Sequence, residues 1–173
     1  MMRIAENGPR TLNALKQLML KKPRLTLAVA ESLTCGRVQA RVGEISGASD
    51  FFLGGITAYT LDAKTRHLGV DRRAARRVNS VSSAIAVQMA RGVCDLFGSD
   101  LGIATTGYAE PSPQNGVAGA YAWWALVHRR RGKFVAVQSG RVECPGESRV
   151  DVQMRVADAV LAELVAYLDE SRR

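Results

Sequence analysis

Three side chains that could carry out nucleophilic chemistry stand in polar stretches that follow apolar ones. They are the hydroxyl of Ser32, the phenol of Tyr59 and the amine of Lys64. A serine hydroxyl is a weak nucleophile at neutral pH and needs a base beside it. The two histidines, His67 and His128, are too isolated to indicate a metal ligand or a Ser-His-Asp hydrolase. What remains is a candidate Ser-Tyr-Lys set.

Each of these residues also has an interpretation without chemistry. Ser32 and Thr34 are residue types that commonly cap helices. Tyr59 could be an aromatic residue that packs at a strand end, and Lys64 could be an ordinary surface lysine. The sequence Thr105-Thr106-Gly107 could form only a tight turn. The residue pattern alone leaves both interpretations open.

Strands and helices alternate along the chain. Hydrophobic spacing predicts strands over residues 25–30, 51–59, 101–105, 118–128 and 133–142, and helices over 11–21, 34–42, 63–68, 82–97 and 149–168. Because helices lie both between and after the strands, the pattern predicts an α/β fold with a mixed sheet covered on both faces by helices. A chain of 173 residues is typical in length of a single domain, so we expect one domain over residues 1–173.

In such a sheet, ligands collect at the carboxyl ends of the strands. Three loops qualify: residues 31–36, the segment that holds Tyr59 and Lys64, and residues 105–113. The first loop leads into a helix, whose free N–H groups favour an anion.

Composition restricts the class of protein. The net charge of +8 comes from dispersed residues, with the densest groups at Arg72–Arg77 and Arg129–Lys133. Neither group is interleaved with aromatic residues, which argues against nucleic-acid binding. Three cysteines without Cys-x-x-Cys spacing predict free thiols and no metal site. Residues 1–10 hold no hydrophobic segment and no apolar run reaches about 18 residues, so we expect a soluble, cytoplasmic protein without membrane association.

Several motifs resemble a known family. The stretch "LAVAESLTCGRVQARVGEISGASDFFLGGITAYTLDAKTRHLGV" is similar to the CinA C-terminal domain family, whose pattern runs approximately A-E-S-x-T-G-G and then G-x-S-x-x-F-x-G-G-x-x-A-Y-S-N-x-x-K. The stretch "VSSAIAVQMARGVCDLFGSDLGIATTGYAEP" resembles the family segments V-S-x-x-V-A-x-x-M-A and T-T-G-x-A-G-P. The matches span roughly residues 10–168, in the right order and with the right spacing.

The resemblance implies a three-layer α/β/α sandwich with a mixed, mainly parallel sheet. The implied reaction is hydrolysis of the carboxamide of nicotinamide mononucleotide, or a related nucleotide amide, to the acid and ammonia. The reaction needs no metal and no cofactor. The resemblance also suggests a homo-oligomer with a small-molecule nucleotide as its partner.

The family's catalytic serine, tyrosine and lysine fall on Ser32, Tyr59 and Lys64. Lys64 would be the base, provided that burial or a neighbouring cation lowers its pKa from about 10.4. Tyr59 would either relay the proton taken up by Lys64 or keep the serine and the lysine in position. N–H groups at the start of the 34–42 helix would stabilise the oxyanion. The Thr105-Thr106-Gly107 turn would hold the nucleotide. The implied substrate-binding residues are Glu31, Thr34, Cys35, Gly36, Gly55, Thr105, Thr106, Gly107 and Arg149.

The sequence also departs from the family pattern. Cys35 stands where the family has glycine, either as a small buried filler or as an alternative nucleophile. Thr60-Leu61 replaces Ser-Asn, and Glu110 replaces a glycine of the phosphate-side loop, where its charge would repel an anion. Either Arg149 or Arg155 could take the basic role before the last helix.

These departures leave two other functions open. One is a catalytically altered CinA-like protein that binds a nucleotide or a protein partner without turnover. The other, less favoured, is a basic nucleic-acid-binding domain.

Overall fold

The computed structural model describes residues 8–173. Residues 1–7, which belong to the N-terminal segment 1–10 in which the sequence shows no hydrophobic stretch, lie outside it. The described chain forms one five-stranded sheet in the order β2-β1-β3-β4-β5. The strands are β1 (Leu27–Glu31), β2 (Phe52–Thr57), β3 (Leu101–Tyr108), β4 (Ala120–Arg130) and β5 (Lys133–Cys144). The helices are α1 (Gly8–Leu20), α2 (Arg37–Gly43), α3 (Leu61–Leu68), α4 (Arg72–Arg77), α5 (Ser83–Phe97) and α6 (Arg149–Ser171), with short 3-10 turns η2 (Ala48–Asp50) and η3 (Pro113–Asn115).

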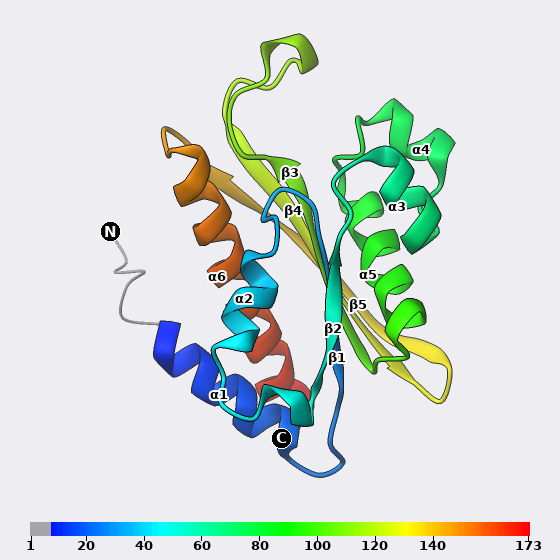
Figure 1. The fold of residues 1–173 in the computed structure, drawn as a ribbon, viewed down its shortest axis with the longest axis vertical. Helices are drawn as coiled ribbons and strands as arrows, with labels where there is room; N and C mark the ends of the chain where they lie inside the picture. The colour runs from blue at the N-terminus through cyan, green and yellow to red at the C-terminus, as the bar shows by residue number, and fades with distance from the viewer. Residues whose placement is uncertain (1–7) are drawn as a thin grey trace.

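The sheet lies between two helical layers (Figure 1), as the resemblance implied. Helices α1, α2 and α6 cover one face, and α3, α4 and α5 lie on the other. Strand β1 pairs in parallel with both β2 and β3, whereas the β3–β4 and β4–β5 pairs are antiparallel. The predicted mixed sheet is therefore confirmed, with β4 running against the other four strands.

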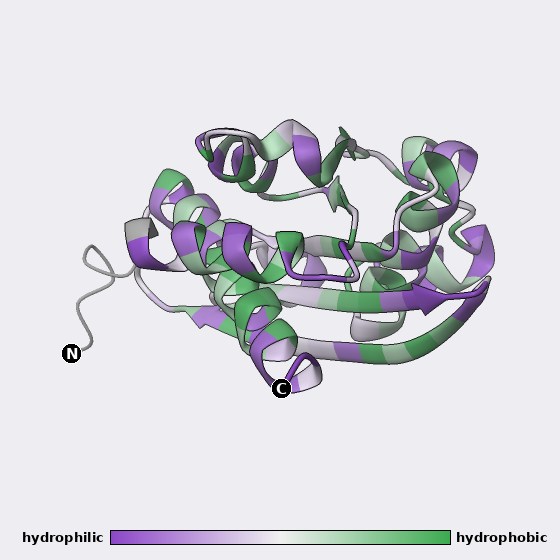
Figure 2. Ribbon diagram, turned by 90° about the horizontal axis from the view of Figure 1, so that it is seen from below, coloured by the Kyte–Doolittle hydropathy of each residue, from purple (hydrophilic) through white to green (hydrophobic). Residues whose placement is uncertain are grey.

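Alternation along the buried strands divides the core between the two layers. In β1, Leu27 and Val29 pack with α1, α2 and α6, while Ala28 and Ala30 face α5. The small side chains on the second face let α5 approach closely, and a Cβ on Gly102 of β3 would lie 2.2 Å from a main-chain oxygen of α5. Figure 2 shows the hydrophobic stretches of the strands between helices that carry both hydrophobic and hydrophilic segments.

Two of the element boundaries that differ from the sequence prediction affect the candidate site. The helix expected over 34–42 begins only at Arg37, because Cys35 and Gly36 have positive φ angles of 51° and 94°. The strand expected over 101–105 runs on to Tyr108, so the predicted turn at 105–107 is wrong. These residues pair with 122–124 of β4, and an antiparallel partner of this length keeps the chain extended past the expected turn.

Glu31, the last residue of β1, organises the start of α2. Its fully buried carboxylate accepts hydrogen bonds from the N–H groups of Gly36 (2.9 Å), Val38 (3.2 Å) and Gln39 (2.9 Å). The Gln39 side-chain amide adds a fourth bond at 3.0 Å. Gly55 makes room for this amide, since a Cβ at Gly55 would lie 2.6 Å from Gln39. The carboxylate therefore takes up the N–H groups that a helix start leaves free.

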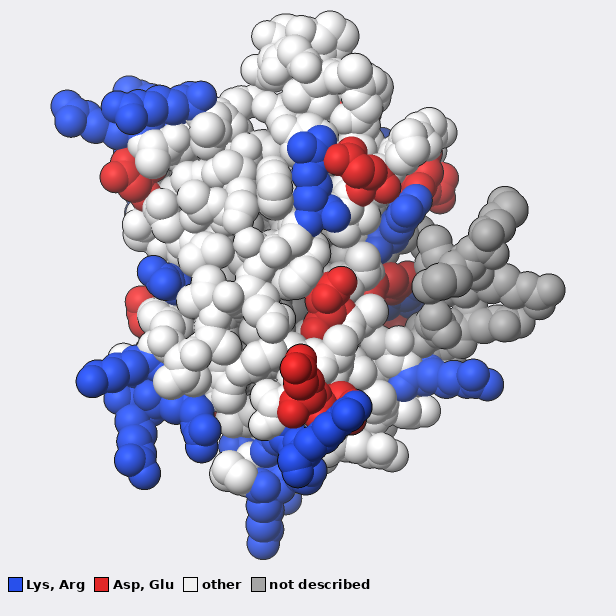
Figure 3. All heavy atoms as spheres, turned by 180° about the vertical axis from the view of Figure 1, so that it is seen from behind, with Lys and Arg blue, Asp and Glu red and all other residues white. Residues whose placement is uncertain are grey.

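The arginines and lysines are dispersed over the surface. Figure 3 shows them in separate groups near the margins of one face, including α4 at the upper left, with acidic side chains beside several of them. Arg72 of α4 pairs with Asp62 at 2.6 Å, and Arg129 pairs with Asp95 at 3.1 Å. The groups do not merge into the continuous stripe that nucleic-acid binding favours. Among the helices of residues 8–173, none is both long enough and apolar enough to cross a bilayer.

The close packing of α5 predicts opposite effects for two helical glycines. A Cβ at Gly92 of α5 would lie 2.0 Å from the main-chain oxygen of Leu68, whereas a Cβ at Gly43 of α2 would meet open space. We expect Gly92→Ala to lower the free energy of unfolding by at least about 2 kcal/mol, and Gly43→Ala to raise it by about 0.5 kcal/mol. Urea denaturation of both variants measures the difference. Equal effects at the two positions would contradict the packing described here.

The hydrogen bonds of Glu31 predict that replacing this glutamate destabilises the fold more than replacing an exposed one. Glu31→Gln places an amide donor where main-chain N–H groups need an acceptor, and should lower the free energy of unfolding by about 2–3 kcal/mol. Glu44→Gln at the exposed end of α2 removes a carboxylate that, among residues 8–173, pairs with Arg41 alone, and should cost less than about 0.5 kcal/mol. Urea denaturation near neutral pH compares the two. A Glu31→Gln variant as stable as the wild type would contradict the capping role.

Candidate functional site

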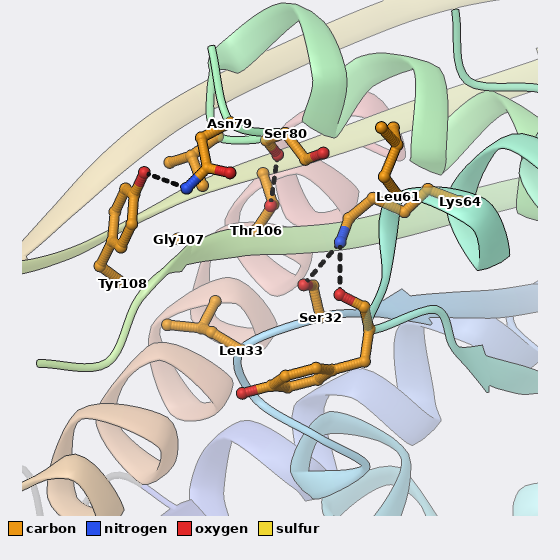
Figure 4. Close-up of a pocket in the computed structure, with 11 residues that line it drawn as sticks. Ser32, Leu33, Leu61, Lys64, Asn79, Ser80, Thr106, Gly107 and Tyr108 are labelled. Atoms are coloured by element: carbon orange, nitrogen blue, oxygen red, sulfur yellow. Dashed lines mark hydrogen bonds between the residues drawn. The ribbon is translucent and has the colours of Figure 1, made fainter. Parts of the chain in front are cut away.

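The serine and the lysine singled out from the sequence meet in the fold. Ser32 follows β1 directly, and Lys64 lies in α3, whose first turn is capped by the Thr60 hydroxyl through the Ala63 N–H at 3.1 Å. The Lys64 Nζ donates a hydrogen bond of 2.9 Å to the Ser32 Oγ and another of 3.1 Å to the Tyr59 carbonyl (Figure 4). A potential nucleophile and a potential base are thus in direct contact.

Lys64 is almost completely buried, with 2% of its surface exposed. Burial disfavours the charged ammonium and lowers the pKa of Lys64 to about 8. An ordinary surface lysine is protonated at neutral pH almost without exception. Lys64 instead has an appreciable neutral fraction under mildly alkaline conditions, as a general base requires.

Tyr59 contacts Lys64 through its main chain and not through the phenol, which was expected to act beside Ser32 and Lys64. Its hydroxyl accepts a hydrogen bond of 2.7 Å from Nη2 of Arg149, and it is the Tyr59 carbonyl that reaches Lys64. The Tyr59 side chain is 49% exposed. The tyrosine therefore holds the lysine through its backbone, while its phenol belongs to a second cluster around the start of α6.

A cavity of about 230 Å³ opens above the Ser32–Lys64 pair, and we call it the inner pocket. Its lining consists of Ser32, Leu33, Tyr59, Leu61, Lys64, Asn79, Ser80, Val81, Thr106, Gly107 and Tyr108. Thr106 and Gly107, which were expected to bind substrate, both lie in this lining and belong to β3. The Thr106 hydroxyl donates to the Ser80 carbonyl at 2.8 Å.

The loop before α5 supplies pocket residues that the sequence analysis missed. Asn79 and Ser80 both have positive φ angles, of 47° and 61°, and Asn79 donates a hydrogen bond of 2.8 Å to the Tyr108 hydroxyl. Asn and Ser between two helical patterns indicate a turn. That signal marks a loop, but it does not reveal that the loop faces Ser32.

A second cavity of about 170 Å³, the outer pocket, adjoins the first. Both pockets share Leu33, Tyr59, Gly107 and Tyr108, and the outer one adds Ala109, Glu110, Pro111, Ser112, Gln114 and Arg149. Arg149 Nη1 lies 2.8 Å from a Glu110 carboxylate oxygen. Arg149 is thus the arginine at the pocket, whereas Arg155 pairs with Glu147.

Several residues expected to bind substrate lie outside both pocket linings. Thr34 and Thr105 are buried and share a hydrogen bond of 2.7 Å between their hydroxyls, which ties the Ser32 turn to β3. Glu31, Gly36 and Gly55 belong to the capping arrangement of α2. These residues shape the site from beneath because their polar groups are already used within the fold.

The position of Cys35 differs from one of its two interpretations from the sequence. The thiol is exposed, so the expected small buried filler is wrong. Its positive φ of 51° explains why glycine suits this position, since a residue with a Cβ is strained there. Cys94 and Cys144 are buried, and all three thiols are free, as predicted.

Comparison with known proteins agrees with the motifs. A family model described as the CinA C-terminal domain matches residues 10–168. A CinA-like protein of Chlorobium limicola is 34% identical over 169 residues, which cover 96% of this chain and 39% of that protein. A CinA-like protein of Salinibacter ruber is 41% identical over 138 residues, covering 76% of this chain and 34% of that protein. The chain therefore spans about a third to two fifths of the length of these relatives.

Solved structures of similar length share the fold. The CinA superfamily protein from Enterobacter cloacae superposes with a TM-score of 0.83 at 28% identity, covering 93% of this chain and 92% of that one. The competence/damage inducible protein CihA from Agrobacterium tumefaciens gives 0.77 at 27% identity, covering 96% and 95%. Because the family model matches nearly the whole chain and these structures share its sheet and layers, the chain belongs to the CinA C-terminal domain family.

Proposed function

We propose that the protein is an amidohydrolase that cleaves the carboxamide of nicotinamide mononucleotide, or of a related nucleotide amide, to the acid and ammonia. The observation that carries the proposal is the 2.9 Å contact between the Ser32 hydroxyl and the buried Lys64 amine. A serine beside a lysine of lowered pKa is an arrangement suited to nucleophilic attack without histidine.

In the proposed reaction, neutral Lys64 takes the Ser32 proton while the Ser32 oxygen attacks the amide carbon. The tetrahedral intermediate collapses when Lys64 returns the proton to the amide nitrogen and ammonia leaves. A water molecule, deprotonated by Lys64, then releases the carboxylic acid and restores Ser32. The second hydrogen bond of Lys64, to the Tyr59 carbonyl, supports this assignment because it aims the amine at Ser32 in both half-reactions.

The oxyanion needs donors other than those expected. Glu31 already uses the N–H groups of Gly36, Val38 and Gln39. Within the described residues, the N–H groups of Leu33 and Thr34 have no hydrogen-bond acceptor, and they follow the nucleophile directly. We assign the oxyanion to the Leu33 N–H, because Leu33 lines both pockets whereas Thr34 is buried outside them, and a preorganised main-chain donor beside the nucleophile stabilises such charge.

Binding without turnover is the second candidate function. It is favoured by one observation, that the Tyr59 hydroxyl is held by Arg149 and does not contact the Ser32–Lys64 pair. A protein of this kind would bind the mononucleotide in calorimetry and release no ammonia from it.

Ammonia release separates these functions. The purified protein should release ammonia from nicotinamide mononucleotide, and Ser32→Ala should lower kcat by at least about 1,000-fold, because it removes the proposed nucleophile and Cys35, the alternative, lies outside both pocket linings. Ser49→Ala, at an exposed serine outside both pockets, is the matched control and should retain full activity. Equal ammonia release by the wild type and Ser32→Ala would end the amidase proposal.

The lowered pKa of Lys64 predicts the pH dependence. Below about pH 8 the amine is increasingly protonated and cannot accept the serine proton, so kcat/KM should fall about tenfold per pH unit and level off above it. Lys64→Met, similar in length but without a titrating amine, should abolish this dependence together with most of the activity. Initial rates between about pH 6 and pH 10 provide the measurement, with circular dichroism to verify folding. A profile that is flat across this range would exclude Lys64 as the base.

A further inference from the structure

The two pockets form one continuous route that leads outward from Ser32. Leu33, Tyr59, Gly107 and Tyr108 line both of them. A substrate whose amide carbon lies at Ser32 and which is longer than the inner pocket can therefore extend into the outer one. What the outer pocket accepts determines which substituent the amide can carry.

Glu110 and Arg149 are the charged members of the outer-pocket lining. They neutralise one another through the 2.8 Å ion pair, and the other arm of the Arg149 guanidinium donates to the Tyr59 hydroxyl at 2.7 Å. Both arms of the arginine are thus in use. A phosphate that approached Arg149 would have to displace Glu110 and would then lie beside its carboxylate.

The loop that carries Glu110 is held by its own hydrogen bonds. Pro111 follows Glu110, and the Ser112 and Val117 main chains exchange N–H···O bonds of 2.9 and 3.1 Å. The Asn115 side-chain amide donates to the Ser112 hydroxyl at 2.8 Å. These contacts fix the main chain that follows Glu110, and the ion pair with Arg149 holds its carboxylate at the pocket.

We infer that Glu110 determines specificity by disfavouring a phosphate in the outer pocket and favouring an uncharged group rich in hydroxyls. This inference rests on the proposed function and extends its substrate class to the nucleoside amide, nicotinamide riboside, which it ranks ahead of the mononucleotide. A carboxylate accepts hydrogen bonds from the hydroxyls of a ribose, as acidic residues do in dinucleotide-binding folds.

Exposure limits the size of the effect. The side chains of Glu110 and Arg149 are 61% and 44% exposed, so water screens the repulsion between Glu110 and a phosphate. We expect the glutamate to change the preference between riboside and mononucleotide by about five- to tenfold. The preference should weaken as the salt concentration rises.

The experiment compares kcat/KM for the riboside and the mononucleotide in three proteins: wild type, Glu110→Gln and Glu143→Gln. Glu143 pairs with Arg141 at 2.6 Å on β5, outside both pockets, and is the matched control. The wild type and the control should prefer the riboside, and Glu110→Gln should shift the ratio about five- to tenfold toward the mononucleotide. Glu143→Gln should keep kcat for both compounds within about twofold of the wild type, because Glu143 lies outside both pockets.

A binding measurement separates failure of this inference from failure of the proposed function. Calorimetry on Ser32→Ala and on the Ser32→Ala, Glu110→Gln double variant gives the dissociation constants of both compounds. If the wild type hydrolyses neither compound, the amidase proposal is lost, while the same shift in relative affinity still supports the role of Glu110. The inference is overturned if Glu110→Gln changes the ratio by less than about twofold, if Ser32→Ala binds the mononucleotide more tightly than the riboside, or if it binds neither.

Discussion

The buried carboxylate of Glu31 is the interaction on which the site depends. It accepts four hydrogen bonds, three from the main-chain N–H groups of Gly36, Val38 and Gln39 and one from the Gln39 side-chain amide, and the next residue in the chain is Ser32. A carboxylate in a dry interior is tolerated only when its hydrogen bonds are satisfied, so the chain cannot pivot at this point without exposing that charge. The turn that follows is fixed for this reason, and the serine is presented at the edge of the sheet with its hydroxyl free to meet α3.

Lys64 meets Ser32 because α3 begins close to the end of β2. The Thr60 hydroxyl caps the helix, and burial of the amine follows from the position of Lys64 on its first turns. Burying an amine is unfavourable for folding and lowers the pKa of Lys64 to about 8. The same physical effect that destabilises the fold therefore makes the amine a better base. Conflicts of this kind between stability and a local arrangement are expected at functional sites.

Arg149 connects the outer pocket with the Ser32–Lys64 pair. Its guanidinium holds the Tyr59 hydroxyl, and the carbonyl of the same tyrosine holds Lys64. Glu110 in turn holds Arg149. In the proposed reaction, a substituent bound in the outer pocket would lie next to Tyr59, the residue that orients Lys64, so Tyr59 would couple substrate specificity to the chemical step.

The sequence by itself determined what depends on neighbours along the chain. Apolar spacing located the strands and helices to within a few residues, and the polar turn after residue 30 and the motifs around Ser32, Tyr59 and Lys64 indicated both the family and two residues that are in contact. Only the tertiary structure decided which polar groups were already engaged. Glu31 accepts hydrogen bonds from the N–H groups at the start of α2 that were expected to stabilise an oxyanion, and pairing with β4 keeps β3 extended where a turn was expected. The Tyr59 hydroxyl contacts Arg149, and residues 79–80 line the inner pocket. Each of these outcomes depends on hydrogen bonds or packing between groups whose competition for partners is settled only when the chain is folded, and no local pattern ranks those partners in advance.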